Sequence, residues 1–344
     1  MRRFSWMCAT AAVVALLASA CSSEEAEKQY YLSLGDDLAV GVQPDESGTP
    51  AETDNGYTDL VASTLADEPP GVEHVKLGCA GEDTATFVEG GAEGCDYEEG
   101  SQLAAAEAFL KENRGRVRLV TVNIGGNNLF ACALDEDGKL TTAIDRECVA
   151  KNLEQVAKDA PVIAQRLREA AGEDVEIIGV TSYNPLLAMY LAEEVTAVVA
   201  TEDDDERTYQ DTANYTNGML AAINGTLTDA YNAEGFTVAN VATRFEVENF
   251  TPVGDLAEGA EDAEGEEAAE GDEQAEDAEE DEKGGLPLNV QNVCQYTWMC
   301  DTERGPHIHL NEAGAKEDPR PWRLSVDLAR DGDRIKMSNV EFVP

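Results

Sequence analysis

The chain has 344 residues, of which 70 are acidic and 24 are basic, so its formal net charge is −46. A surface this acidic offers no basic stripe to a phosphate backbone, which excludes nucleic acid as a partner. Residues 255–283 hold 16 acidic residues and one lysine, yet the rest of the chain still carries −31. The acidity therefore belongs to the whole surface, as in proteins that stay soluble at high salt. Residues 255–285 are predicted to form a disordered acidic insert in a surface loop.

The first twenty residues have the layout of a signal peptide for export, and residues 21–29 that of a polar tether. Two arginines precede an apolar stretch of nine residues, and three small residues follow before Cys21. The Ala-Ser-Ala-Cys ending resembles a bacterial lipobox, in which the cysteine is acylated and anchors the protein to a membrane. We therefore expect lipidation at Cys21 and an extracytoplasmic, cell-membrane lipoprotein. Because Ala18 stands where leucine is usual, an ordinary secreted protein is the alternative.

Short apolar runs alternate with helical patterns along the chain. Strands are expected at residues 30–34, 72–77, 117–124, 175–181 and 236–241, and helices at 57–67, 102–113, 150–171 and 207–233. This alternation is typical of an α/β protein whose parallel sheet is covered on both faces. The sequence predicts one such domain over residues 30–314, with three α/β/α layers around a central, mainly parallel five-stranded sheet.

The segment after Gly314 departs from this pattern. Pro319 and Pro321 would break a closing helix, and the alternation over residues 323–343 predicts strands around the turn at Asp331-Gly332. Residues 315–344 are therefore predicted to be a divergent C-terminal tail.

Six cysteines follow Cys21, and an even number in an exported chain favours disulfides over metal ligands. Six cysteines allow 15 connectivities, but neighbours in the sequence fall into three closely spaced pairs. We predict disulfides Cys79–Cys95, Cys132–Cys148 and Cys294–Cys300. Each of the two wider loops would remove roughly 3 kcal/mol of unfolded-chain entropy in the loop-closure model.

The residues that could carry chemistry follow the predicted strands, where ligands of such sheets bind. The first strand leads into Gly35-Asp36-Asp37-Leu38, the second into 77–81 and the third into 124–128, and the C-terminal part adds His307 and His309. A strand that ends in a tight Gly turn and opens into a helix presents residue 37 at the sheet edge, near helix N-terminal amides. A serine there would be an acyl-transfer nucleophile, but the residue is Asp37.

These runs resemble the four sequence blocks of the SGNH (GDSL) hydrolases, and most closely the secreted actinobacterial esterases and lipases of that group. Asp37 falls on the nucleophile serine, Gly78 on the second block's glycine, Asn127 on the third block's asparagine and His309 on the last block's histidine. The resemblance implies an SGNH, flavodoxin-like fold. It also implies Asp37 at the nucleophile position, His309 at the base position, and an oxyanion hole of Gly78 and Asn127.

Two departures from the family bear on activity. The family's acid, two or three residues before the histidine, falls here on His307 or Pro306. Loss of a triad serine costs on the order of 10⁶-fold in turnover. We therefore expect a pseudoenzyme without serine-hydrolase activity. Its Asp37 carboxylate would accept hydrogen bonds from Gly78 and Asn127 and pair with His309, which lowers the pKa of the carboxylate.

Three interpretations stay open from the sequence alone. The first is a lipoprotein whose crevice binds an ester, acyl or glycan ligand. The second is an active carboxylic-ester hydrolase or lipase that uses Asp37, or another unorthodox nucleophile, with His309. The third is a structural surface lipoprotein without a ligand. No cofactor is expected, and a two-His, one-carboxylate metal site of Asp37, His307 and His309 is the weaker interpretation of that cluster.

Overall fold

The structure is a computed structural model that describes residues 28–66, 71–133, 144–191, 209–253, 285–315, 323–331 and 334–343. The signal peptide, Cys21 and nearly all of the acidic insert lie outside these ranges, so the predictions made for them stay predictions. Within the described ranges, no helix combines the length and the apolar character needed to cross a membrane.

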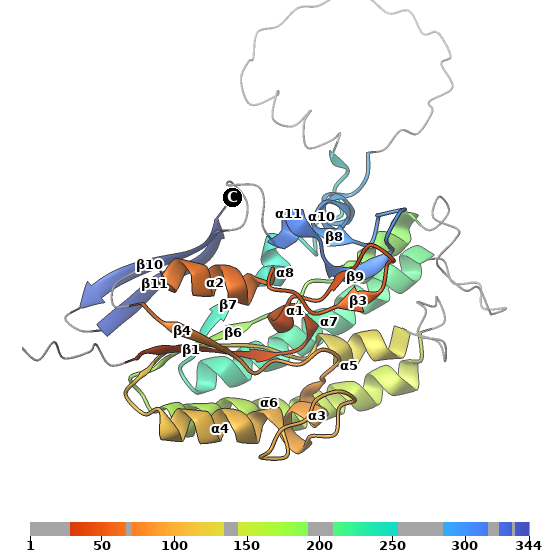
Figure 1. Cartoon of the computed structure of the whole chain (residues 1–344). Coiled ribbons are helices and arrows are strands. Elements are labelled where there is room, and N and C mark those ends of the chain that lie inside the picture. Colours follow the sequence, from red (N-terminus) through yellow and green to blue (C-terminus); the bar gives the residue numbers. More distant parts are fainter. Residues whose placement is uncertain are drawn as a thin grey trace, which may run out of the picture.

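Five strands form one parallel sheet in the order β4-β1-β5-β6-β7 (Figure 1). The strands are β1 (Tyr30–Gly35), β4 (Glu73–Lys76), β5 (Val117–Asn123), β6 (Glu176–Val180) and β7 (Thr237–Ala239). Each begins and ends within two residues of its predicted bounds. The prediction of a five-stranded parallel sheet in an α/β fold is confirmed.

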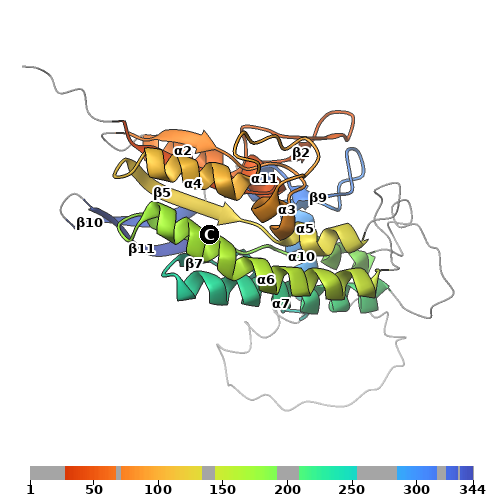
Figure 2. The ribbon, with the colours of Figure 1, turned by 90° about the horizontal axis from the view of Figure 1, so that it is seen from below.

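Helices cover both faces of this sheet. On one face, α4 (Gln102–Glu112), α6 (Arg146–Ala171) and α7 (Tyr209–Ala233) lie side by side (Figures 1 and 2). On the other lie α2 (Tyr57–Ala66) and α8 (Val241–Arg244) (Figure 1). Because both faces are covered, successive residues of the central strands are buried without alternation, as Leu119, Val120 and Val122 of β5 illustrate.

The remaining elements are short and lie between these main ones. They are α1 (Asp37–Val40), β2 (Gln43–Pro44), β3 (Pro50–Ala51), α3 (Thr84–Glu89), α5 (Gly126–Phe130), η1 (Ala131–Ala133), η2 (Pro185–Leu191), α10 (Leu288–Tyr296), β8 (Thr297–Trp298), β9 (His307–Leu310) and α11 (Glu312–Ala315). The tail forms an antiparallel pair of strands, β10 (Arg323–Asp331) and β11 (Arg334–Val343), as predicted, and residues 332–333 of the predicted turn lie outside the described ranges.

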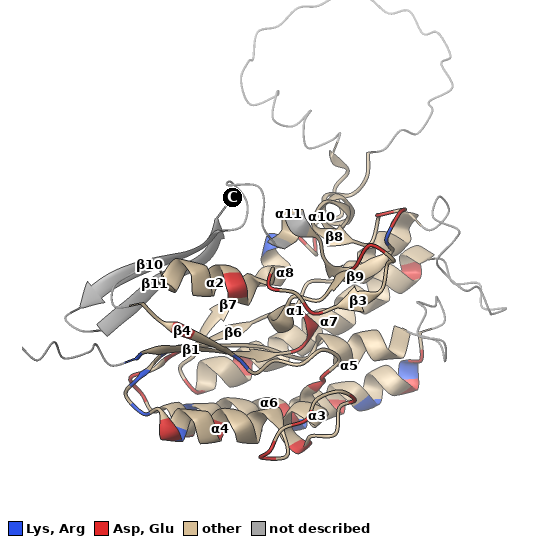
Figure 3. Cartoon of the chain, in the orientation of Figure 1, with Lys and Arg blue, Asp and Glu red and all other residues tan. Residues whose placement is uncertain are grey.

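Polar side chains mark where the helices begin. Asp83 and Thr86 form a reciprocal capping box at α3, the Ser101 hydroxyl accepts the Ala104 N–H at α4, and Asp145 accepts the Glu147 N–H at α6. Each cap satisfies backbone N–H groups that have no partner inside the helix. Acidic residues are spread over helices of both layers, in line with the charge of the whole surface (Figure 3).

Three disulfides join Cys79 to Cys95, Cys132 to Cys148 and Cys294 to Cys300, the pairing expected from their spacing. The first joins the loop after β4 to the loop between α3 and α4, the second ties η1 to α6, and the third ties α10 to the turn after β8. The first and third therefore brace segments on either side of the edge of the sheet where the strands end.

Gly35, the last residue of β1, has φ +131, and a Cβ atom there would lie 1.9 Å from the carbonyl oxygen of Asn123. We predict that Gly35→Ala lowers the free energy of unfolding by about 3 kcal/mol or more, from backbone strain and overlap. Urea denaturation followed by circular dichroism measures this change. Gly218→Ala is the control, because that exposed glycine of α7 has open space at its Cβ and should stabilise by about 0.5–1 kcal/mol. A Gly35→Ala protein as stable as the wild type would contradict the steric argument.

Candidate active site

The end of β1 presents Asp37 at the edge of the sheet. The Asp36 N–H donates to the Asn123 carbonyl at 3.0 Å, which holds the turn against β5. The Asp36 carboxylate caps α1 by accepting the Leu38 N–H at 3.2 Å. Asp37 is therefore the first residue of α1, in the position that the strand–turn–helix pattern predicted.

The Asp37 carboxylate accepts three hydrogen bonds. Its Oδ2 accepts Asn127 Nδ2 at 2.7 Å and the Gly81 N–H at 2.9 Å, and its Oδ1 lies 3.2 Å from His309 Nε2. Burial opposes ionisation of this carboxyl, but the bonds from His309, Asn127 and Gly81 outweigh it and lower the pKa of Asp37 to about 2. Asp37 is thus an anion over the whole physiological range of pH.

Contacts to β9 hold His309 in place. The Tyr183 hydroxyl donates to the carbonyl of Ile308 at 2.8 Å, and β9 pairs antiparallel with β8. His309 Nδ1 lies 2.7 Å from His307 Nδ1, and the two rings stack with centroids 4.6 Å apart. Burial and the neighbouring His309 lower the pKa of His307 to about 4, so His307 is neutral at pH 7.

His307 thus stands where the acid of a triad would orient His309. A neutral imidazole can share one hydrogen bond with His309 Nδ1, but it brings no negative charge to stabilise a histidinium. Asp301 is engaged elsewhere, because its carboxylate accepts the N–H groups of Glu303 and Arg304. In the arrangement Asp37–His309–His307, the only anion is at the nucleophile position.

Buried polar groups hold the donors of this site in place. Gln102 of α4 donates to the carbonyl of Gly35 and accepts its N–H, and the same amide donates to the Glu82 carboxylate. The Glu82 carbonyl in turn accepts Asn127 Nδ2 at 3.0 Å. Burial raises the pKa of Glu82 to about 7, against the hydrogen bond from Gln102. One amide therefore links the end of β1 to the loop that orients Asn127.

The pKa of Asp36, the neighbour of Asp37 in the sequence, is shifted in the opposite direction. Asp36 is buried, and burial together with the Asp37 anion raises its pKa well above the usual value. Two adjacent carboxyl groups thus titrate far apart because only one of them faces hydrogen-bond donors from three other segments.

One of the expected donors differs from the sequence-based prediction. The backbone N–H that reaches Asp37 belongs to Gly81, whereas Gly78 packs against Ala39, Val40 and the Gly35 carbonyl. Both glycines occur in the predicted run 77–81, so the sequence located the loop but not the residue. The supporting roles of Gln102, Glu82 and Tyr183 were missed as well, because they arise from α4, the β4–α3 loop and the β6 loop and share no short motif.

A serine–histidine pair lies within the sheet, but it does not form an alternative active site. Ser33 Oγ lies 2.8 Å from His74 Nε2, and His74 Nδ1 lies 3.9 Å from the Asp59 carboxylate. Ser33 is fully buried in β1, so its hydroxyl cannot reach a substrate. Burial also lowers the pKa of His74 to about 4.

The space beside Asp37 is small. A cavity of about 10 Å³ is lined by Asp37, Leu38, Tyr57, His309 and Leu310, among others. This volume corresponds to about one water molecule.

Residues 33–316 match the GDSL-like Lipase/Acylhydrolase family. The chain belongs to this family. The match includes the four runs at Asp37, Gly78, Asn127 and His309, which lie in the order of the family's sequence blocks. Among the residues described, the GDSL-like chain has no group of three or more His, Cys, Asp or Glu side chains that could hold a metal ion.

Solved structures similar to this GDSL-like chain include two hydrolases. One is the extracellular lipase of Streptomyces rimosus, with 17% identity and a TM-score of 0.40 over 63% of this chain and 82% of the lipase. The other is the aryl esterase of M. smegmatis, with 11% identity and a TM-score of 0.34 over 62% of this chain and 85% of the esterase.

The C-terminal tail has a separate similarity. Residues 306–344 match a family described as Uncharacterized protein Rv1363c/MT1408-like. A stretch of 34 residues is 59% identical to the uncharacterized protein Rv1363c of Mycobacterium tuberculosis and spans 10% of this chain and 13% of that protein. The two family matches overlap at residues 306–316, which include His307 and His309.

The lowered pKa of Asp37 makes the stability of the fold depend on acid. A carboxyl with a pKa of about 2 when folded and 3.8 when unfolded stabilises the fold above pH 4 and loses that contribution as the pH falls toward 2. We predict that the wild type loses about 2 kcal/mol more than Asp37→Asn between pH 5 and pH 2. Urea denaturation at a series of pH values measures the difference.

The control for this experiment is Asp229→Asn, which removes an exposed carboxyl of α7 far from these donors. It should leave the acid dependence of the wild type unchanged. Equal acid dependence of the wild type and Asp37→Asn would show that the three hydrogen bonds contribute nothing to stability.

Proposed function

We propose that this protein is an exported, lipid-anchored pseudoenzyme of the GDSL-like family, without serine-hydrolase activity, whose crevice binds an ester, acyl or glycan ligand. The observation that carries the proposal is the saturation of the Asp37 carboxylate by Asn127, Gly81 and His309. The groups that acyl transfer needs for the substrate are already engaged by the protein itself.

The need of acyl transfer for an oxyanion hole supports this proposal. In acyl transfer, preorganised N–H donors stabilise the oxyanion that develops on the substrate. Here Asn127 and Gly81 donate to a permanent anion of the chain, so a substrate carbonyl would have to displace a charge-assisted bond of 2.7 Å. The Asp37 carboxylate thus takes two of the donors that an oxyanion would need.

The rival function is a hydrolase in which Asp37 attacks the ester and His309 activates the water that releases the product. Attack by a carboxylate on an ester gives an anhydride, and the carboxylate must first give up the bonds that lower its pKa to about 2. A carboxylate stabilised as an anion to this degree is a poor nucleophile. The hydrogen-bond pattern therefore favours the pseudoenzyme.

Restoring the serine tests the proposal directly. We predict that the wild type hydrolyses p-nitrophenyl acetate and butyrate no faster than the His309→Ala variant does. The Asp37→Ser variant should gain hydrolysis that exceeds the wild type by at least about 10²-fold, because the serine frees Asn127 and Gly81 for the oxyanion. Initial rates at high salt measure both.

The matched control is Asp37→Ser with His309→Ala, which removes the base and should return the rate to the background. Turnover by the wild type that His309→Ala abolishes would overturn the pseudoenzyme and support the rival hydrolase. If Asp37→Ser stays inactive but Asp37→Ser with His307→Asp is active, the loss of the acid is part of the decay of the site.

The lipid anchor is tested at Cys21. We predict that mass spectrometry of the protein from the membrane fraction of its native host finds an acylated N-terminal Cys21. The Cys21→Ser variant should lack the acyl mass and lose its membrane association, since the acyl chains that hold the protein at the membrane are attached to this cysteine. A native chain that begins elsewhere and carries no acyl group would contradict the anchor without affecting the pseudoenzyme proposal.

A further inference from the structure

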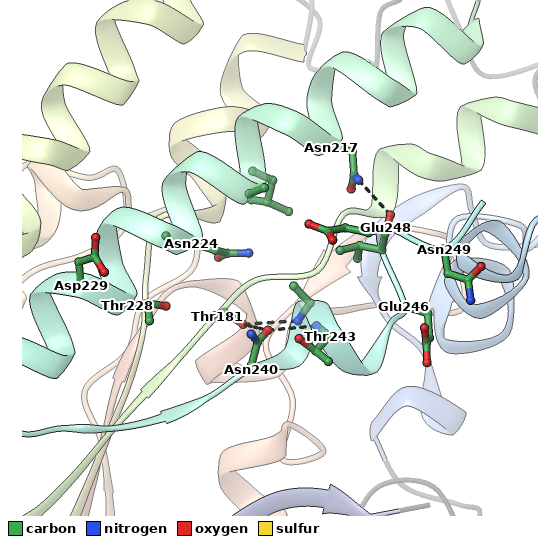
Figure 4. Close-up of a pocket in the computed structure, with 15 residues that line it drawn as sticks. Thr181, Asn217, Asn224, Thr228, Asp229, Asn240, Thr243, Glu246, Glu248 and Asn249 are labelled. Carbon is green, nitrogen blue, oxygen red and sulfur yellow. Dashed lines mark hydrogen bonds between the residues drawn. The ribbon is translucent and has the colours of Figure 1, made fainter. Parts of the chain in front are cut away.

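A second cavity, formed by described residues, lies away from Asp37. It is a groove of about 660 Å³ between α7 and the segment that follows β7 (Figure 4). Its walls include Asn224 and Thr228 of α7, Thr181 after β6, Asn240 and Thr243 at α8, and Glu248. A volume of this size matches the pockets in which proteins bind small organic ligands.

The groove shares no lining residue with the cavity beside Asp37. Asn224 closes the groove on that side, since its amide accepts the Ser182 N–H and donates to the Ser182 carbonyl. Ser182 in turn lies against Gly126, the residue before Asn127. One layer of side chains thus separates the groove from the oxyanion donors.

One wall of the groove is rigid. Asn217 of α7 and Asn289 of α10 both donate to the carbonyl of Val247, at 2.9 and 3.1 Å, and Asn292 donates to that of Phe245. Within this turn Glu246 has φ +52, a conformation that is costly for a residue with a Cβ atom. Such strain persists only where surrounding contacts hold it, and it occurs most often at functional sites.

The floor of the groove is aliphatic and its rim is polar. Leu220, Ala242 and Val247 supply apolar surface, and Gly225 of α7 leaves open space where a side chain would stand. The Asn240 Oδ1 atom accepts the Thr243 N–H at 3.0 Å and lies 3.3 Å from the Thr181 hydroxyl. These contacts of its oxygen orient the Asn240 side chain, which lines the groove.

The charges around the groove narrow the class of ligand. None of the lining residues is a lysine or an arginine, so phosphates and carboxylates have no counter-charge there. Of the three lining carboxylates, Glu248 points toward Asn224 and Glu246 points away from it (Figure 4). Exposed carboxylates scattered among amides and hydroxyls do not make a cation site, and no metal-binding cluster occurs among the described residues.

We propose that this groove is a second ligand site and that it binds a neutral saccharide. Amide, hydroxyl and carboxylate groups offer donors and acceptors to the hydroxyls of a sugar, and the aliphatic floor accepts its C–H face. The rigid wall reduces the ordering cost of binding. The site is independent of the pseudoenzyme proposal, because it uses no residue of the Asp37 cluster.

The test measures binding of uncharged sugars to the full chain by saturation-transfer NMR and calorimetry. The probes are glucose, mannose, galactose, trehalose and maltotriose, with glucuronate as the anionic and putrescine as the cationic comparison. We expect at least one neutral sugar to bind, with a dissociation constant that changes less than about twofold between 0.05 and 0.5 M NaCl, because screening acts only on charges. Binding of putrescine alone, or of no neutral sugar, would overturn the proposal.

Variants locate the binding. Gly225→Trp places an indole where Gly225 faces open space and should weaken sugar binding by at least tenfold. Thr226→Trp, one residue further along α7 and outside the lining, is the matched control and should bind as the wild type does. Asn240→Ala should weaken binding by about fivefold or more, while Asp37→Asn should leave it unchanged.

Thermal unfolding of each variant checks that it folds. Sugar binding that survives Gly225→Trp in a folded protein would place the ligand elsewhere and overturn the assignment. Loss of binding in Asp37→Asn but not in Gly225→Trp would assign the sugar to the crevice of the proposed pseudoenzyme instead, so that failure of one proposal is distinguished from failure of the other.

Discussion

The Asp37 carboxylate and its three donors organise the carboxyl edge of the sheet. Asn127 follows β5, Gly81 follows β4, His309 lies on β9, and Asp37 itself follows β1. Four segments that are far apart in the sequence therefore converge on two oxygen atoms. Because the anion is buried, each donor compensates part of its lost hydration, and removal of any one would leave a charge incompletely solvated. An enzyme of this family would satisfy the same donors with its substrate, whereas this chain satisfies them internally.

The electrostatics of the site follow from that convergence. The Asp37 anion is stabilised, while burial and this anion together raise the pKa of Asp36. His307 is kept neutral by burial and by His309. A triad places its negative charge at Nδ1 of the histidine. Here Nδ1 of His309 faces the neutral His307, and the anion of Asp37 lies at Nε2 instead. In the proposed pseudoenzyme, both differences would act against acyl transfer.

The GDSL-like family supplies the framework over residues 33–316, and a second family similarity begins within it at residue 306. The tail carries the similarity to an uncharacterized mycobacterial family and follows directly on the segment with His307 and His309. Loss of the acid position and the beginning of this second similarity occur within the same few residues. The groove beside α7 is lined by residues outside 306–344. Its rigid turn at Glu246 is held by asparagines of α7 and α10.

Local patterns in the sequence determined most of the fold. The apolar runs at residues 30–34 and 117–124 are long enough, and flanked closely enough by turn residues, to predict β1 and β5. Pairing of cysteines 16 residues apart predicted Cys79–Cys95 and Cys132–Cys148, because a short loop keeps such neighbours close in any compact fold. The position of Asp37 at the end of β1 and the start of α1 likewise followed from one strand–turn–helix motif.

Only the tertiary structure decided which donors meet Asp37 and what else surrounds them. Gly81 rather than Gly78 reaches the carboxylate because the loop after β4 turns over the sheet edge, and its path depends on Gln102 and Glu82 from other segments. The contact between His307 and His309 depends on how Tyr183 holds β9. The groove beside α7 is formed by residues 181–249, whose packing no local pattern encodes. Hydrogen bonds and cavities of this kind arise from distances across the fold, and a sequence read by its local periodicity contains no such distances.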